Sequence, residues 1–109
     1  MTVFIKELGN GEPLILLHGW GFNHHIWQPI IEPLAARWRL YLVDLPGHGK
    51  NESCAYQLPV LIEQLTTQLP KNARWVGWSL GGLIAMAVAR WQPEYVQQLL
   101  LVSTSPRFV

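Results

Sequence analysis

Cysteine, charge and long apolar runs are all scarce in this sequence of 109 residues. The single cysteine, Cys54, excludes an internal disulfide and fits a reducing compartment. Charged residues make up 14% of the chain and the net charge is +1 without a basic stripe, so nucleic acid is not expected as a partner. No apolar run reaches membrane-spanning length, and the amino terminus does not resemble a signal peptide. We therefore expect a cytoplasmic protein with no membrane contact.

Motifs for dinucleotides, phosphate groups and metals are also missing. Each G-x-G in the sequence has another residue at the third glycine position of the dinucleotide fingerprint, namely Leu14, His24 or Glu52. The Gly-Lys pair at 49–50 lacks the glycine spacing and the hydroxyl residue of a phosphate-binding loop. The neighbouring His24 and His25 would point in different directions, and no cysteine or carboxylate lies at ligand spacing from them. The sequence thus predicts no cofactor and no metal.

Apolar residues, in contrast, make up 50% of the chain, which is ample for the core of a single domain. Apolar runs typical of buried strands alternate with apolar residues at helical spacing. We expect strands at 3–8, 14–17, 40–43, 74–78 and 96–102 and helices at 26–38, 58–69 and 80–91. This alternation predicts an α/β fold with a mostly parallel sheet and helices on both of its faces. The first strand ends in the turn signal Gly-Asn-Gly, which predicts an edge strand in a hairpin.

The rest of the chain is organised around the stretch GWSLGG at residues 77–82. An expected strand precedes Ser79 and an expected helix follows it, which places the serine on the turn between them. This is the context of a nucleophile elbow, in which small residues two positions before and after a strained serine leave room for the turn. We predict Ser79 to be a catalytic nucleophile, with Gly77 and Gly81 supporting the elbow.

Two backbone amides are candidates for an oxyanion hole. The amide of Leu80 stands at the start of the expected helix, where amide groups lack partners and favour a negative oxygen. The second candidate is the amide of Trp20, which lies between two glycines in the loop HGWG after a buried strand. An ordinary glycine-rich strand exit has the same pattern, and the elbow downstream is what favours the oxyanion interpretation.

The sequence does not supply an obvious base and acid for the serine. A serine nucleophile needs a base to take its proton and a carboxylate to orient that base. Beyond Ser79 there is no histidine and only one acid, Glu94, although folds with this elbow place the acid and then the histidine later in the chain. Asp44 and His48 precede the serine and could be argued into a triad as orienting acid and base. Both belong to a loop rich in glycine and proline, however, where we expect them to shape the wall of a cleft.

Three motifs, HGWG at 18–21, DLPGHG at 44–49 and GWSLGG at 77–82, together make this chain resemble the amino-terminal half of α/β-hydrolase fold enzymes. The tryptophans Trp20 and Trp78 make it most similar to the carboxylesterases of biotin synthesis. The resemblance implies that Ser79 attacks the methyl ester of a pimeloyl chain carried on acyl carrier protein. It also implies that the amides of Trp20 and Leu80 hold the oxyanion, that methanol leaves and that no cofactor takes part.

The same resemblance implies that residues 1–109 are a partial α/β-hydrolase domain. The catalytic acid, the histidine and a helical lid would belong to a second half, so we expect no triad-level hydrolysis by this chain alone. Two alternatives stay open: a carboxylesterase for other short acyl groups, and a truncated remnant without catalysis. The expected strand at 96–102 would leave an apolar edge unpaired, through which two copies could form a homo-oligomer.

Overall fold

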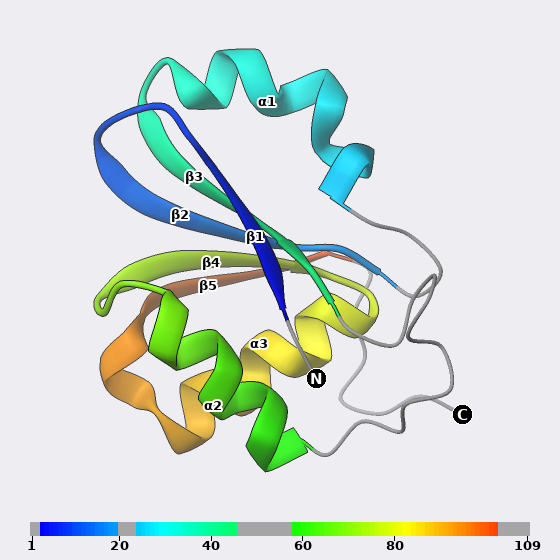
Figure 1. Ribbon diagram of the computed structural model, residues 1–109, viewed down its shortest axis with the longest axis vertical. Helices are drawn as coiled ribbons and strands as arrows, with labels where there is room; N and C mark the ends of the chain where they lie inside the picture. The colour runs from blue at the N-terminus through cyan, green and yellow to red at the C-terminus, as the bar shows by residue number, and fades with distance from the viewer. Residues whose placement is uncertain (1–2, 20–23, 46–57, 103–109) are drawn as a thin grey trace.

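The computed structural model describes residues 3–19, 24–45 and 58–102, which form a sheet between two layers of helices (Figure 1). The helix α1 (Gln28–Ala35), with the short 3-10 helix η1 (His24–Trp27) before it, lies on one face of the sheet. The helices α2 (Leu58–Gln68) and α3 (Leu80–Trp91) lie on the other face. The α/β class and the helices on both faces are therefore confirmed.

Within the described residues, the sheet has five strands: β1 (Phe4–Leu8), β2 (Glu12–Leu17), β3 (Trp38–Asp44), β4 (Ala73–Trp78) and β5 (Val96–Val102). Their order across the sheet is β1-β3-β2-β4-β5. Among these five strands, β1 pairs with β3 in the antiparallel direction, while the other neighbours run parallel. The carboxyl ends of β2, β3, β4 and β5 therefore meet at the same end of the sheet.

The predicted hairpin at the amino terminus is wrong, although the edge strand is confirmed. β3 lies between β1 and β2, so the turn at residues 9–11 joins two strands that are not hydrogen-bonded neighbours. Gly9 has φ 81°, and a Cβ atom there would lie 2.7 Å from the carbonyl oxygen of Ala35. The glycine turn thus rests against the end of α1. A local turn signal could not show that a strand from further along the chain inserts here.

The predicted helix at 26–38 is also too long. It begins as η1, continues as α1, and is followed by a turn, with Trp38 already the first residue of β3. Trp38 pairs with Glu12 of β2 and packs against the core on this face. Its spacing from Ile31 and Leu34 continues the helical period, and for this reason the sequence pattern extended the helix too far.

Separate cores lie on the two faces of the sheet. Beneath α2 and α3, side chains that are at most 1% exposed include Ile15, Leu17, Leu61, Leu65 and Trp75. Beneath α1, a smaller cluster consists of Leu14, Leu16, Trp27, Leu40 and Leu42. β2 and β3 contribute to both clusters because successive side chains of a strand point to opposite faces. These strands are accordingly apolar runs without alternation.

Among the described strands, β5 lies at the edge of the sheet opposite β1, and it carries exposed apolar side chains. Leu100 is 59% exposed, Val102 is 40% exposed and Leu101 is 37% exposed. The predicted apolar edge is therefore confirmed. The pairing of two copies through it stays a prediction.

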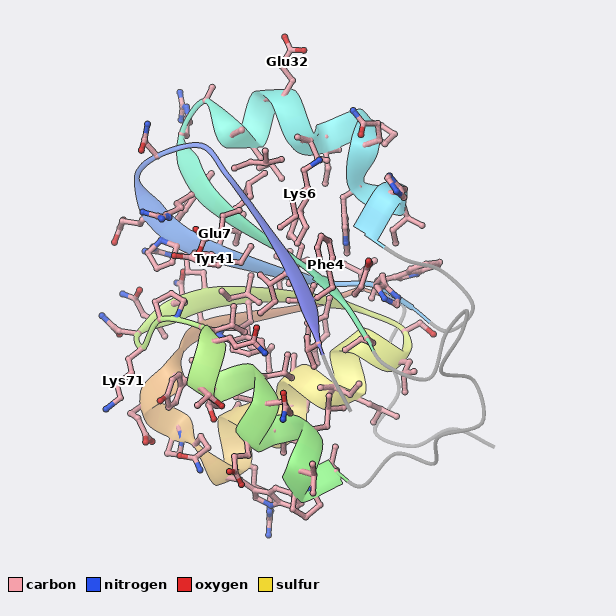
Figure 2. All side chains as sticks on the ribbon, in the orientation of Figure 1. Phe4, Lys6, Glu7, Glu32, Tyr41 and Lys71 are labelled. Atoms are coloured by element: carbon pink, nitrogen blue, oxygen red, sulfur yellow. The ribbon has the colours of Figure 1, made fainter. Side chains whose placement is uncertain are left out.

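Charged side chains lie on the outside of the layers. Figure 2 shows Glu32 pointing away from the sheet on the outer side of α1, and Lys71 projecting from the turn before β4. The ammonium group of Lys71 lies 5.8 Å from the centroid of the Tyr95 ring. Among the described residues, no helix combines the length and the apolar character that a membrane span requires.

Candidate active site

Ser79 forms the turn between β4 and α3 in a strained backbone conformation. Its φ is 56° and its ψ is −117°, and such conformations cost about 1–3 kcal/mol. Backbone hydrogen bonds hold the turn on both sides. The Ser79 amide donates to the carbonyl oxygen of Val102 at 3.0 Å, and the Ser79 carbonyl accepts from the amide of Gly82 at 3.0 Å. The predicted order of strand, serine turn and helix is confirmed.

Two glycines let the backbone segments around this turn come close together. A Cβ atom on Gly77 would lie 2.5 Å from the Cα atom of Gly82, and one on Gly81 would lie 2.6 Å from the carbonyl oxygen of His18. These neighbours are backbone atoms, which cannot swing away as the end of a side chain can. The first allows the end of β4 to meet the start of α3, and the second allows α3 to meet the end of β2.

The loop after β2 lies directly against the serine turn. A Cβ atom on Gly19 would lie 2.9 Å from Cε3 of Trp78 and 3.2 Å from the Cβ atom of Ser79. Two of the three predicted motifs are thus in contact through Gly19. Trp20, the next residue in this loop, lies outside the described residues, and its part in an oxyanion hole stays a prediction.

Leu80 is the first residue of α3, and its side chain packs against the larger core. As the first helical residue it has no acceptor in a preceding turn of the helix for its amide. The amides of Gly82 and Leu83, in contrast, both donate to the Ser79 carbonyl. The start of the helix also carries a partial positive charge. A negative oxygen on a group bound to Ser79 would meet this end of α3.

His18 has a structural role that the sequence pattern did not predict. This side chain is fully buried, its Nδ1 atom lies 2.7 Å from the carbonyl oxygen of Gly19, and its Nε2 atom accepts from the Leu45 amide at 2.9 Å. Because Nε2 accepts, Nδ1 carries the proton and donates to Gly19. His18 therefore ties the end of β2 to the end of β3. A polar residue directly after four large apolar ones was the available signal for a buried role.

Two acids considered for a triad lie away from Ser79. The amide of Asn72, just before β4, donates to the carbonyl oxygen of Glu94 at 2.9 Å. Glu94 thus lies at the amino end of β4, about 20 Å from Ser79 by the rise of a six-residue strand. Asp44 is level with Trp78 but two strands across the sheet, about 10 Å away. His48, which could act as the base beside Asp44, lies outside the described residues.

An apolar pocket of about 320 Å³ lies beside the first turn of α3. The described residues that line it are aliphatic side chains of α2 and α3, namely Leu58, Leu61, Leu80, Leu83 and Ile84. A second pocket, of about 440 Å³, is larger but is lined by residues of β4 and β5 that include Arg74 and Gln98, near the amino ends of these strands. The smaller pocket is the one that adjoins the serine turn, because Leu80 directly follows Ser79. Among the described residues no group of three or more His, Cys, Asp or Glu side chains could hold a metal ion.

Comparison with protein families identifies the class to which this fold and this serine turn belong. Residues 12–109 match the family model of the alpha/beta hydrolase fold, and the chain belongs to this family.

More specific similarity is to esterases. The chain is 46% identical over 112 aligned positions to a pimeloyl-[acyl-carrier protein] methyl ester esterase of Aeromonas salmonicida, with all of this chain and 44% of the relative covered. It is 49% identical to the protein of that name from Yersinia pseudotuberculosis, with 92% of this chain and 40% of the relative covered. A crystal structure of a hydrolase from Pseudomonas aeruginosa superimposes with a TM-score of 0.88 at 25% identity, covering 98% of this chain and 43% of that one. This chain thus spans about two fifths of the length of these relatives.

Proposed function

We propose that this chain carries the nucleophile of a serine carboxylesterase, and that Ser79 is that nucleophile. The observation that supports this most is the backbone of Ser79, with φ 56° at a turn between a strand and a helix. A strained residue that its surroundings over-determine is typical of a functional site. The close approaches at Gly77 and Gly81 support their role as the small residues of the elbow.

In the proposed reaction, Oγ of Ser79 attacks the ester carbonyl carbon while a base takes the hydroxyl proton. The carbonyl oxygen becomes an oxyanion, and we assign its stabilisation to the amides of Leu80 and Trp20. Collapse of this intermediate breaks the bond to the alcohol oxygen, which leaves with the proton from the base. Water then hydrolyses the acyl-enzyme by the same steps and releases the acid.

The base and its orienting acid are proposed to come from a part of the protein beyond residues 1–109. Three observations support this. Nε2 of His18 already accepts a buried hydrogen bond, Glu94 lies at the wrong end of β4, and the relatives are more than twice as long as this chain. We therefore infer that residues 1–109 form one part of a longer α/β-hydrolase domain.

We further propose that the substrate is the methyl ester of a pimeloyl group on acyl carrier protein. The names of the relatives at 46% and 49% identity support this substrate. A carboxylesterase for other short acyl groups is the nearest alternative, because the same serine turn serves any ester that fits. A remnant without catalysis is the third.

Covalent labelling tests the nucleophile. In the complete protein, which includes the base, a fluorophosphonate probe should modify Ser79, and the modified peptide should be identified by mass spectrometry. Ser79→Ala should remove the label, whereas Ser53→Ala, at a serine without a proposed role, should leave it. Labelling that persists in Ser79→Ala would contradict the assignment of the nucleophile.

Complementation tests the missing base. The purified chain should hydrolyse p-nitrophenyl esters poorly, because triad enzymes without one member retain only about 10³–10⁴ of acceleration over water. Addition of the carboxyl-terminal part of the Aeromonas salmonicida relative as a separate polypeptide should raise the rate. Full activity of the chain alone would instead favour His48 as the base and Asp44 as the acid that orients it.

A further inference from the structure

We propose that the buried side chain of His18 is a positioning residue for the oxyanion hole, because its hydrogen bond fixes the peptide unit that carries the Trp20 amide. This inference rests on the proposed function of Ser79 and deepens it. Beyond tying the end of β2 to the end of β3, the imidazole ring would control one of the two proposed donors. It acts through the backbone and exchanges no proton in the proposed reaction.

The hydrogen bond from His18 reaches the peptide unit that contains the proposed donor. Nδ1 of His18 lies 2.7 Å from the carbonyl oxygen of Gly19. This oxygen and the N–H of Trp20 belong to one peptide unit, which is planar, and in a trans unit the C=O and N–H groups point in opposite directions. A hydrogen bond that fixes the carbonyl of Gly19 therefore also fixes the direction of the N–H on the other side of the unit.

The ring of His18 is itself held in place, as a positioning residue requires. The side chain is fully buried, and Nε2 accepts from the Leu45 amide at 2.9 Å. Leu45 directly follows β3 and is 3% exposed, so this end of the ring is anchored in the core. Because Nε2 is used as an acceptor, the proton of the neutral ring is on Nδ1, which donates it to Gly19. The bond to Leu45 thus selects the tautomer that the bond to Gly19 needs.

The fixed peptide unit begins next to the proposed nucleophile. A Cβ atom on Gly19 would lie 3.2 Å from the Cβ atom of Ser79. The backbone of His18 also touches the first turn of α3, where a Cβ atom on Gly81 would lie 2.6 Å from the His18 carbonyl oxygen, and this turn carries the Leu80 amide, the other proposed donor. A donor that is fixed in advance costs no reorganisation when the oxyanion forms. A hydrogen bond accepted at the carbonyl also polarises the N–H of the same unit.

Two substitutions separate the two hydrogen bonds of the ring. The amide nitrogen of asparagine can take the place of Nδ1, so His18→Asn keeps a donor for Gly19 and loses the acceptor for Leu45. The longer glutamine reaches the place of Nε2, so His18→Gln keeps the acceptor and loses the donor. Each variant leaves one buried backbone group without its partner. We therefore expect similar falls in the urea midpoint for the two variants.

Turnover of a p-nitrophenyl ester by the complete protein should differ between these variants. His18→Gln should lower kcat about 10²-fold with little change in KM, because the oxyanion forms only in the transition state. His18→Asn should keep kcat within a few-fold of its original value. His25→Asn and His25→Gln, at an exposed histidine, are the matched controls and should change neither constant. A purely structural role of His18 would give equal losses of kcat in its two variants, and this outcome would overturn the proposal.

A spectroscopic measurement on the intact chain of 109 residues does not depend on turnover. The sequence has two Gly-Trp pairs, at 19–20 and 77–78. Labelling with glycine that carries ¹³C at the carbonyl and with ¹⁵N-tryptophan therefore gives one signal for each pair in a spectrum that correlates an amide with the preceding carbonyl. His18→Gln should move the Gly19 carbonyl signal upfield, because its hydrogen bond is lost, whereas His18→Asn should leave it close to its original position. The Gly77 carbonyl is the internal reference and should move in neither variant.

The outcomes separate this proposal from the function on which it rests. A Gly19 signal that moves in His18→Gln alone supports the control of the peptide unit by His18, even if the probe does not label Ser79. A signal that moves in neither variant, or equally in both, overturns the proposal even if Ser79 is labelled. If neither variant folds, the ¹⁵N signals of the His18 ring in the unchanged chain decide. A proton on Nδ1 supports the proposal, and a proton on Nε2 overturns it.

Discussion

The two ends of strand β4 differ in what holds them. At its carboxyl end, backbone atoms meet without room for a side chain, as at Gly81, and the polar side chain of His18 is fully buried. At its amino end, side chains do the pairing: Nε of Arg74 donates to Gln98 at 2.6 Å, and its guanidinium lies 5.1 Å from the Trp38 ring centroid. The side chain of Arg74 can rotate and replace these contacts with hydrogen bonds to water.

This difference shows where the molecule is intolerant of change. Contacts between backbone atoms cannot relax when an atom is added, whereas paired side chains at the surface lose little when one partner is replaced. The end of the sheet that holds Ser79 should therefore respond strongly to small substitutions, and exposed pairs elsewhere on the sheet should respond weakly.

The largest effect is expected for Gly81→Ala. In most helices this change stabilises by about 0.5–1 kcal/mol. Here the new Cβ atom would meet the backbone of Leu17 and His18, so we expect a loss of about 3 kcal/mol in the free energy of unfolding, measured with urea. The control is Ala89→Gly in the same helix, which should cost only about 1 kcal/mol. If Gly81→Ala stabilised the protein, the close approach of α3 to β2 would be wrong.

The next largest effect is expected for His18→Leu. Leucine fills a similar volume, but it leaves the Leu45 amide and the Gly19 carbonyl without their hydrogen-bond partner. An unsatisfied buried group costs about 1–3 kcal/mol, and urea unfolding should report a loss of this size. His25→Leu makes the same change at an exposed histidine and should cost less, because water can replace the partners of an exposed group. Equal effects at the two positions would mean that the buried hydrogen bonds of His18 contribute nothing.

A smaller effect, of opposite sign, is expected from relief of strain at Ser79. Ser79→Gly and Ser79→Ala both remove the hydroxyl, but only glycine adopts φ 56° without cost. Glycine also has an entropic cost, which offsets part of this gain. We therefore expect the free energy of unfolding of Ser79→Gly to exceed that of Ser79→Ala by about 1 kcal/mol. Equal urea midpoints for the two variants would argue against a strained turn.

The smallest effect is expected for Glu7→Gln, between β1 and β3. Nη2 of Arg39 donates to Oε2 of Glu7 at 3.1 Å, and this hydrogen bond raises the pKa of Arg39. Both side chains are about half exposed, at 47% and 49%, so water and salt screen the pair. The urea midpoint should shift slightly at low salt and not at all in 1 M NaCl. A shift comparable with that of His18→Leu would mean that exposed pairs on the sheet are as sensitive to substitution as the buried contacts near Ser79.

The serine turn and the elements around it could be predicted because their causes are local. Helix α3 and strand β5 have the bounds that the sequence predicts, since each is a continuous pattern with clear turn residues at its ends. The strained turn at Ser79 is likewise indicated by the small residues two positions away on each side, because they leave room for it.

What could not be predicted depends on residues far apart in sequence. The prediction of a hairpin was wrong because β3 inserts between β1 and β2. The hydrogen bond from Leu45 to His18 links two strand ends, and no local pattern shows it. The pocket needs Leu58 of α2 to face Leu83 of α3, and the sequence alone does not align these helices.

The hydrogen bond from the Ser79 amide to Val102 has a consequence for reactivity. Val102 is the last residue of β5, and β5 is the edge strand of the sheet that the described residues form, where local opening needs little free energy. One of the hydrogen bonds that hold the serine turn is thus made to an edge strand and not to an interior strand. The Ser79 amide should therefore exchange its hydrogen at the pace of β5 and faster than the amides of β2. A segment that pairs with β5 should therefore stabilise this hydrogen bond and keep Ser79 in its strained conformation for longer.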